Sequence, residues 1–190
     1  MIGLYRKKKD TFFSAAVLFK KNKIKILKLK IPILKKGQVL IKNIFSGICH
    51  TQKLEYSGKR GKDKFYPHCF GHESVAKVIS VGAGVKKIKK GDLVISSWIK
   101  GKGIAAVTAQ YFTENNLKIN SGPIAVFSEL SIVSENRLYK KPNSITNEYA
   151  ALFGCAIPTG MGCVKNLSNL NNKSKVCIIG AGGIGTFSIL

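Results

Sequence analysis

The chain has 190 residues, of which 45% are hydrophobic and ten are Phe. This length suits one medium domain or two small ones, and the composition supports a buried core and excludes a disordered tail. Five cysteines without dense spacing exclude a disulfide framework. We therefore expect reduced thiols and a cytoplasmic protein.

The formal net charge is +23, from 32 Lys and Arg against nine Asp and Glu. A balance of this kind is typical of nucleic-acid binders. Only Arg6, Arg60 and Arg137 are arginines, however, whereas recognition of phosphates and bases favours the planar Arg guanidinium. The lysines run along the whole chain among many Ile and Asn residues. This pattern indicates a compositional bias and a solvated basic surface, so we do not expect a nucleic-acid partner.

No window reaches the roughly 18 to 20 uninterrupted apolar residues that a membrane span needs. The opening stretch has basic residues before an apolar run, as a signal peptide does. Asp10 interrupts it, however, and no small-residue cleavage site follows. We expect neither export nor a membrane anchor.

The pattern of residues 15–48 is typical of β-strands. Residues 23–31 alternate Lys with Ile or Leu, which predicts a strand with one apolar and one solvated face. An alternating strand resumes at residues 38–43, and residues 74–81 and 93–98 form a second predicted pair across a Gly-rich turn. These segments predict a small all-β unit with short connections.

Residues 99–122 are polar and rich in Gly and Asn, which predicts a long loop. Strand character returns at residues 127–133 and 137–140. Residues 148–153 and 159–167 are rich in helix formers, with Gly154 and Pro158 expected to interrupt them.

The last motif is a G-x-G-x-x-G turn, which directly follows an apolar strand predicted at residues 175–179. A strand before such a turn and an apolar segment after it are the context of a dinucleotide-binding fingerprint. Its glycines allow a tight turn, close approach of backbone amides to a pyrophosphate, and close packing of helix on strand. The alternative is an ordinary glycine-rich turn of a sheet protein.

Two cysteines and a histidine form a second candidate site: Cys49, His72 and Cys155. Two thiolates and an imidazole make a three-ligand zinc set with an open fourth position, which is the catalytic arrangement. Cys49 and His72 lie near glycines at predicted element ends, where side chains can converge. The alternative is that each is a buried thiol or a core histidine.

These residues lie within motifs that resemble the zinc-containing alcohol dehydrogenases of the medium-chain dehydrogenase/reductase family. The motifs occur in the family's order from about residue 15 onward: GICHT, PHCFGHE with the following VISVGAGVKKIKKGDLV, FGCAIPTG and IIGAGGIG. The resemblance implies a mainly β, GroES-like, partly open barrel. It also implies that the first βα element of an incomplete Rossmann domain follows the barrel.

The resemblance places Cys49, His72 and Cys155 as ligands of one catalytic Zn²⁺, with the Glu73 carboxylate behind or exchanging with them. Such an ion acts as a Lewis acid on a bound alcohol or aldehyde, and hydride passes to or from a nicotinamide. The implied substrate is a small alcohol or aldehyde, and the cofactor is NAD or NADP.

Further roles follow from the same resemblance. Thr51 matches the hydroxyl that relays the alcohol proton, and His50 matches a position that faces the cofactor pyrophosphate. Trp98 would line the substrate pocket, with ordinary core packing as the alternative. The glycines implied to hold the cofactor are Gly180, Gly182, Gly183 and Gly185.

The sequence departs from the family pattern at three places. No cysteine lies between Cys69 and Cys155, so we expect no structural zinc and another anchor for residues 99–122. Gln52 stands where many members have an Asp that orients the histidine ligand, and an amide polarises that ligand less. Leu54 replaces a terminal relay histidine found in some members.

We expect a GroES-like catalytic domain over residues 1–150. Residues 151–190 would supply a hinge helix and the first strand and glycine loop of a truncated nucleotide-binding domain. One strand and one helix cannot bury their own apolar surface, so we expect a fragment that is inactive alone, with a homo-oligomer or a separately encoded C-terminal half as its partner. The alternatives are a catalytically inactive product that retains a zinc-binding β-domain, and a basic nucleic-acid binder.

Overall fold

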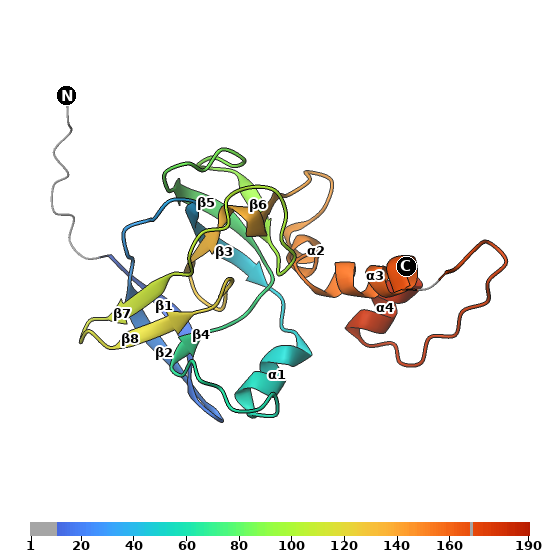
Figure 1. Cartoon of the computed structure of the whole chain (residues 1–190), viewed down its shortest axis with the longest axis horizontal. Coiled ribbons are helices and arrows are strands. Elements are labelled where there is room, and N and C mark those ends of the chain that lie inside the picture. Colours follow the sequence, from blue (N-terminus) through green and yellow to red (C-terminus); the bar gives the residue numbers. More distant parts are fainter. Residues whose placement is uncertain (1–10, 168) are drawn as a thin grey trace.

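A computed structural model describes residues 11–167 and 169–190 of the chain. The opening stretch, with the start of the predicted 1–150 domain, lies outside these residues. Ten strands form two sheets among the described residues, and the helices lie mainly toward the C-terminus (Figure 1). None of the described helices combines the length and apolarity needed to cross a membrane.

The first sheet closes on itself as a five-stranded barrel. Its strands, in spatial order, are β1 (Phe12–Lys20), β2 (Lys23–Lys30), β7 (Gln110–Thr113), β8 (Lys118–Ser121) and β4 (His68–Cys69). The second sheet is open. Its order is β10 (Leu138–Lys140), β6 (Leu93–Ser96), β5 (Ser74–Val81), β3 (Gln38–Ser46) and β9 (Leu130–Ser134).

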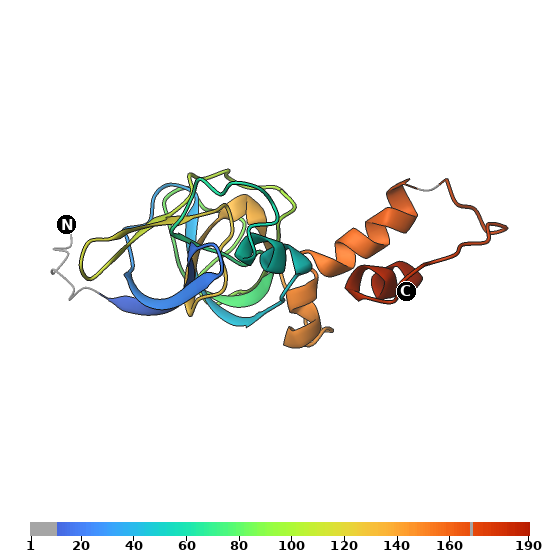
Figure 2. The same cartoon turned by 90° about the horizontal axis from the view of Figure 1, so that it is seen from below.

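The helical elements are short. They are α1 (His50–Tyr56), the 3-10 turn η1 (Glu135–Arg137), α2 (Asn147–Leu152), α3 (Ala156–Leu167) and α4 (Gly183–Ile189). The views in Figures 1 and 2 agree that α3 and α4 lie side by side and extend away from the sheets. The expected mainly β architecture is confirmed.

The β1–β2 hairpin follows from its alternating sequence. Residues pair across it in register, with Phe13 opposite Leu29. Both side chains are buried in the barrel while the lysines of β2 face outward. The turn between the strands places Asn22 at a φ of 57°, a left-handed conformation that Asn tolerates well.

The barrel is closed where we expected it to be partly open. The closing strand β4 pairs antiparallel with β1, with Val17 opposite Cys69, and parallel with β8. Two residues suffice for β4 because it only has to bridge the edge strands β1 and β8. The chain continues from β4 directly toward His72.

The predicted loop at residues 99–122 is wrong, because it contains β7 and β8. Tyr111 and Ile119 face each other across this pair, and both are buried in the barrel. The Tyr111 ring packs edge-on against Phe13, with 5.4 Å between ring centroids. Each strand has only one buried residue, and in β7 the apolar Phe112 next to it is exposed, so the sequence lacks the alternation that marks a strand.

A buried carboxylate anchors the start of the same segment. Glu135 is 2% exposed and accepts hydrogen bonds from the backbone N–H groups of Lys86 and Lys87, each 2.7 Å long. It accepts a third bond, of 2.8 Å, from the N–H of Ile104. Glu135 therefore ties two loops to the end of β9.

Two predictions for the C-terminal part are corrected. Pro158 does not interrupt a helix but lies in the first turn of α3, where its missing N–H has no helical partner to lose. The strand expected at residues 175–179 is not formed. A strand of a parallel sheet needs neighbours for its hydrogen bonds, and no described strand lies beside this segment.

We expect Glu135→Gln to lower the free energy of unfolding by about 2 kcal/mol at neutral pH, because a buried carboxylate loses charge-assisted hydrogen bonds. Burial raises the pKa of Glu135, but the donors around it, with the Lys87 ammonium, outweigh this and hold the pKa below its usual value. The stabilisation is therefore complete above the ordinary Glu pKa and is lost as the pH falls through the lowered folded-state value.

Urea denaturation at a series of pH values measures this effect. The exposed Glu114→Gln variant is the control and should stay within about 0.5 kcal/mol of the wild type. A Glu135→Gln variant as stable as the wild type at neutral pH would contradict the anchoring role.

Candidate metal centre

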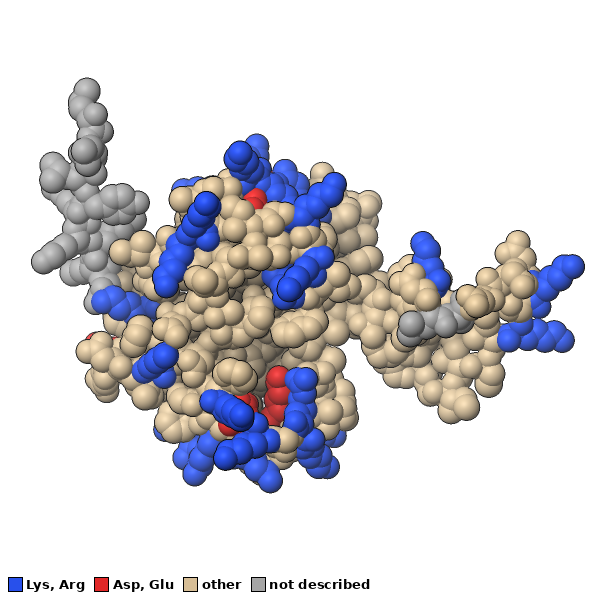
Figure 3. Space-filling model, viewed as in Figure 1, with Lys and Arg blue, Asp and Glu red and all other residues tan. Residues whose placement is uncertain are grey.

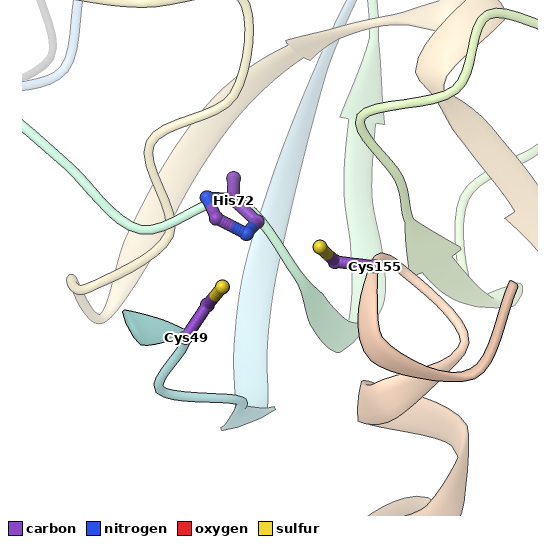
Figure 4. Close-up of side chains that lie close together, drawn as sticks. All are labelled: Cys49, His72 and Cys155. Carbon is purple, nitrogen blue, oxygen red and sulfur yellow. The ribbon is translucent and has the colours of Figure 1, made fainter. Parts of the chain in front are cut away.

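The three predicted ligands come from three distant segments of the chain. Cys49 precedes the first turn of α1, His72 lies between β4 and β5, and Cys155 lies between α2 and α3. Figure 4 shows their side chains pointing toward one another. One ligand atom from each lies within 4.8 Å of the other two. The fold thus brings together the residues that the sequence singled out.

His72 presents one ring nitrogen to the sulfurs and the other to the protein. Its Nδ1 lies 2.7 Å from Nε2 of Gln52. Its Nε2 is buried and has no hydrogen-bond partner among the described residues. A buried nitrogen left without a partner costs free energy, and a metal ion held between the imidazole and two thiolates would satisfy it. The donor set therefore fits a metal ion, and zinc in particular.

Burial and neighbouring charges shift the pKa values at this site. Burial, and after it the charges of Glu73 and Cys49, raise the pKa of Cys155 to about 11. Burial also raises the pKa of Glu73, which backbone N–H groups offset in part. Burial, followed by the charge of Arg60, lowers the pKa of His72. Burial thus disfavours a charge of either sign on these side chains, and a bound divalent cation would favour the thiolate forms of the cysteines.

Glu73 follows His72 in the chain, and its carboxylate is buried against the backbone that follows Cys155. Its side chain is 2% exposed, and its Oε2 accepts a 3.1 Å hydrogen bond from the Ala156 N–H. A Cβ atom at Gly47 would lie 2.6 Å from Oε1 of Glu73, and one at Gly154 would lie 2.5 Å from its Cβ. Glycine is required at both positions because the chain closes tightly around this carboxylate.

The candidate metal centre opens into a cavity of about 640 Å³. Cys155, His72, Thr51 and Trp98 all line it, and the Thr51 hydroxyl lies 3.6 Å from the sulfur of Cys49. Trp98 is half exposed, with its ring centroid 6.2 Å from that of His72. The Arg137 guanidinium holds Trp98 by donating to its carbonyl oxygen and by lying over its ring. A small organic molecule fits in this space beside the ligands.

Residues 35–143, more than half of the chain, match the family described as alcohol dehydrogenase GroES-like domain. The chain belongs to this family. The resemblance to zinc-containing alcohol dehydrogenases of the medium-chain family is thereby confirmed.

Relatives of this alcohol dehydrogenase GroES-like domain share both sequence and fold with it. The S-(hydroxymethyl)glutathione dehydrogenase of Haemophilus influenzae is 31% identical over 196 residues, which cover 90% of this chain and 52% of the relative. The alcohol dehydrogenase zinc-binding domain protein of Burkholderia ambifaria superposes with a TM-score of 0.83 at 21% identity, over 95% of this chain and 55% of that one.

The 2R,3R-butanediol dehydrogenase of Bacillus subtilis superposes with a TM-score of 0.71 at 27% identity, over 93% of this chain and 53% of that one. The chain thus spans about half the length of the curated relatives it matches.

The residues predicted to bind a cofactor do not line the cavity. His50 is exposed at the start of α1, and the glycine turn before α4 is absent from the cavity wall. The backbone of this turn is tight at two of its glycines. Gly180 has a φ of 95°, and a Cβ at Gly185 would lie 1.9 Å from the Gly180 carbonyl oxygen. The helix therefore packs directly on the turn.

A hydrogen-bonded pair in the cavity wall, His68 and Asp63, had no place among the sequence predictions. Nε2 of His68 lies 2.8 Å from a carboxylate oxygen of Asp63, and the His68 ring stacks on Tyr66. Both His68 and Asp63 line the cavity. The only sequence signal is a carboxylate five positions before a histidine, which is too common to indicate a site.

The basic residues of the domain are spread over its surface, and two of them, Arg60 and Lys62, line the cavity. Figure 3 shows Lys and Arg over several separate parts of the visible face, including the C-terminal segment. This distribution agrees with the solvated basic surface expected from the sequence.

We expect the zinc affinity of the wild type to rise more steeply with pH than that of Cys155→Ser. The ratio of the two affinities should increase about tenfold per pH unit between pH 6 and 8, because the wild type releases one more proton on binding. The pKa of Cys155 is about 11, so binding must displace its proton throughout this range. Chelator competition at several pH values measures the slopes.

The exposed Cys163 supplies the matched control, and Cys163→Ser should keep the wild-type slope. Equal slopes for Cys155→Ser and the wild type would show that Cys155 is not a ligand.

Proposed function

We propose that the chain is the zinc-binding catalytic part of an oxidoreductase that transfers hydride between an alcohol or aldehyde and NAD or NADP. The convergence of Cys49, His72 and Cys155, of which His72 and Cys155 line a cavity, carries this proposal. The names of the sequence relatives and structural neighbours, which are dehydrogenases of alcohols and of a hydroxymethyl thiol adduct, support it.

Cys49, His72 and Cys155 would hold one Zn²⁺, with a fourth position open toward the cavity. When bound, zinc in such a set acts as a Lewis acid that polarises an alcohol or aldehyde oxygen and favours the alkoxide. Glu73 supports this set from below by fixing the backbone that carries Cys155. Its hydrogen bond to the Ala156 N–H supports this positioning role.

Other side chains of the cavity would orient the substrate and move its proton. Thr51 lies next to Cys49 and faces the cavity, so its Oγ1 can accept the alcohol proton and pass it toward solvent. Trp98 offers an apolar wall for the carbon skeleton of the substrate. We propose that His50, together with Gly180, Gly182, Gly183 and Gly185, contacts the cofactor pyrophosphate.

We further propose the domain division stated above, with a GroES-like domain over residues 1–150 and the beginning of a nucleotide-binding domain over 151–190. A homo-oligomer or a separately encoded C-terminal half would complete the cofactor site. A cytoplasmic location remains a prediction.

The second candidate function is a zinc-binding β-domain without catalysis. One observation favours it: the glycine turn is not preceded by the strand that a dinucleotide-binding unit requires, and Ile179 is 97% exposed.

We expect metal analysis of the zinc-loaded protein to give one zinc per chain. Cys155→Ser should weaken binding by more than the roughly 10- to 100-fold loss typical of residues that only support a ligand. Cys177→Ser, at an exposed position outside the centre, should bind as the wild type does. Two tightly bound equivalents in the wild type, or unchanged affinity in Cys155→Ser, would exclude the proposed ligand set.

Cofactor binding and turnover separate the two functions. The zinc-loaded chain is titrated with NADH and NADPH, and then assayed with alcohols, aldehydes and S-(hydroxymethyl)glutathione for the change in nicotinamide absorbance. Saturable cofactor binding with turnover that Cys155→Ser abolishes supports the oxidoreductase. If the protein binds zinc at the centre but shows neither cofactor binding nor turnover, the non-catalytic β-domain is the better description of this chain.

A further inference from the structure

The side chain that orients His72 is an amide with a single oxygen. Gln52 is in the first turn of α1 and is 4% exposed. Its Oε1 accepts a 2.9 Å hydrogen bond from the backbone N–H of Cys49, and its Nε2 lies 2.7 Å from Nδ1 of His72. Gln52 thus contacts two of the three ligand residues at once.

This arrangement decides which nitrogen of His72 carries the proton. The Gln52 oxygen is engaged by Cys49, so the group that faces His72 is the NH₂ donor. A donor at this distance requires Nδ1 to be the acceptor, and the proton of the neutral imidazole then lies on Nε2. Nε2 is the buried nitrogen without a partner that faces the two sulfurs. A protonated Nε2 has no lone pair to give to a metal ion.

Turning the amide over does not remove the conflict. Its oxygen would then accept from a protonated Nδ1, but its NH₂ group would face the Cys49 N–H, which is also a donor. Metal-bound histidines generally donate their second N–H to a carboxylate, a carbonyl or water. The Gln52 amide has a single oxygen, and this oxygen can face either a protonated Nδ1 of His72 or the backbone N–H of Cys49. It cannot accept hydrogen bonds from both.

We propose that Gln52 is a positioning residue that holds His72 with its proton on Nε2 and thereby weakens zinc binding at this centre. The inference rests on the zinc site proposed above. When metal binds, the Nε2 proton leaves to solvent and Nδ1 takes one up, so the imidazole stays neutral. The Gln52 amide then either exchanges the positions of its oxygen and its NH₂ group, or keeps its orientation and leaves the Nδ1–H of His72 without an acceptor. Zinc affinity thus includes the cost of breaking a hydrogen bond at the start of α1.

Gln52→Glu tests this inference, because the two side chains have the same length and Glu has two acceptor oxygens. The variant can accept from the Cys49 N–H and from a protonated Nδ1 together. We expect zinc to bind about 10- to 100-fold more tightly to Gln52→Glu than to the wild type in chelator competition. Asn120→Asp is the control for charge, since it adds a carboxylate to the wall of the same cavity, and it should change the affinity less than threefold.

The tautomer of His72 provides a second measurement that needs neither activity nor metal. In ¹⁵N-resolved NMR spectra of the metal-free protein, the wild type should carry the His72 proton on Nε2, and Gln52→Glu should carry it on Nδ1. A wild type protonated on Nδ1 would overturn the inference, even if the Glu variant failed to fold. So would a Gln52→Glu variant that binds zinc no more tightly than Asn120→Asp.

A different result would show that the proposed zinc site itself is wrong. In that case Cys155→Ser would bind zinc as well as the wild type does. If Cys155→Ser loses zinc while Gln52→Glu matches the wild type, the site stands and only the role of Gln52 is refuted.

Discussion

The burial of Glu73 is the constraint on which the geometry of the metal centre depends. Its backbone carbonyl accepts the Gly47 N–H, its carboxylate accepts the Ala156 N–H, and Gly154 lies against its Cβ. The segments that carry Cys49 and Cys155 are thus fastened to the residue next to His72. A carboxylate at this depth is costly unless it is hydrogen-bonded, so the backbone around it has little freedom to move. The three candidate ligand residues converge because the segments that carry them share one buried partner, Glu73.

The sequence was sufficient to single out the three residues that converge at the candidate metal centre and to predict most of the β-structure. The alternation in β2 and the Gly-flanked motifs around Cys49, His72 and Cys155 are local patterns with direct physical meaning. Predictions failed where the deciding partner is remote. The strands β7 and β8 exist because Tyr111 and Ile119 fill the barrel, and the apolar run at residues 175–179 lacks the neighbours that make such a run a strand.

Two hydrogen-bonding arrangements depend on how the folded backbone places their partners. Glu135 holds loops from two parts of the chain through backbone N–H groups, which every residue except proline offers. The contact between Gln52 and His72 joins positions 20 residues apart. The sequence identified Gln52 only as a departure from the family pattern. The cost of that departure depends on which donor occupies the amide oxygen, and this is a property of the folded backbone.

The two-residue strand β4 also couples the metal centre to the folding of the barrel. It pairs with β1 and β8, which are far from it in the sequence, and the chain then runs through only two residues to His72. Such long-range pairing closes large loops of the chain and therefore has a large entropic cost. The closed barrel therefore helps to hold His72 close to Cys49 and Cys155. A metal ion that binds only this arrangement stabilises the closed barrel by mass action, so metal occupancy reports completed tertiary structure rather than local folding.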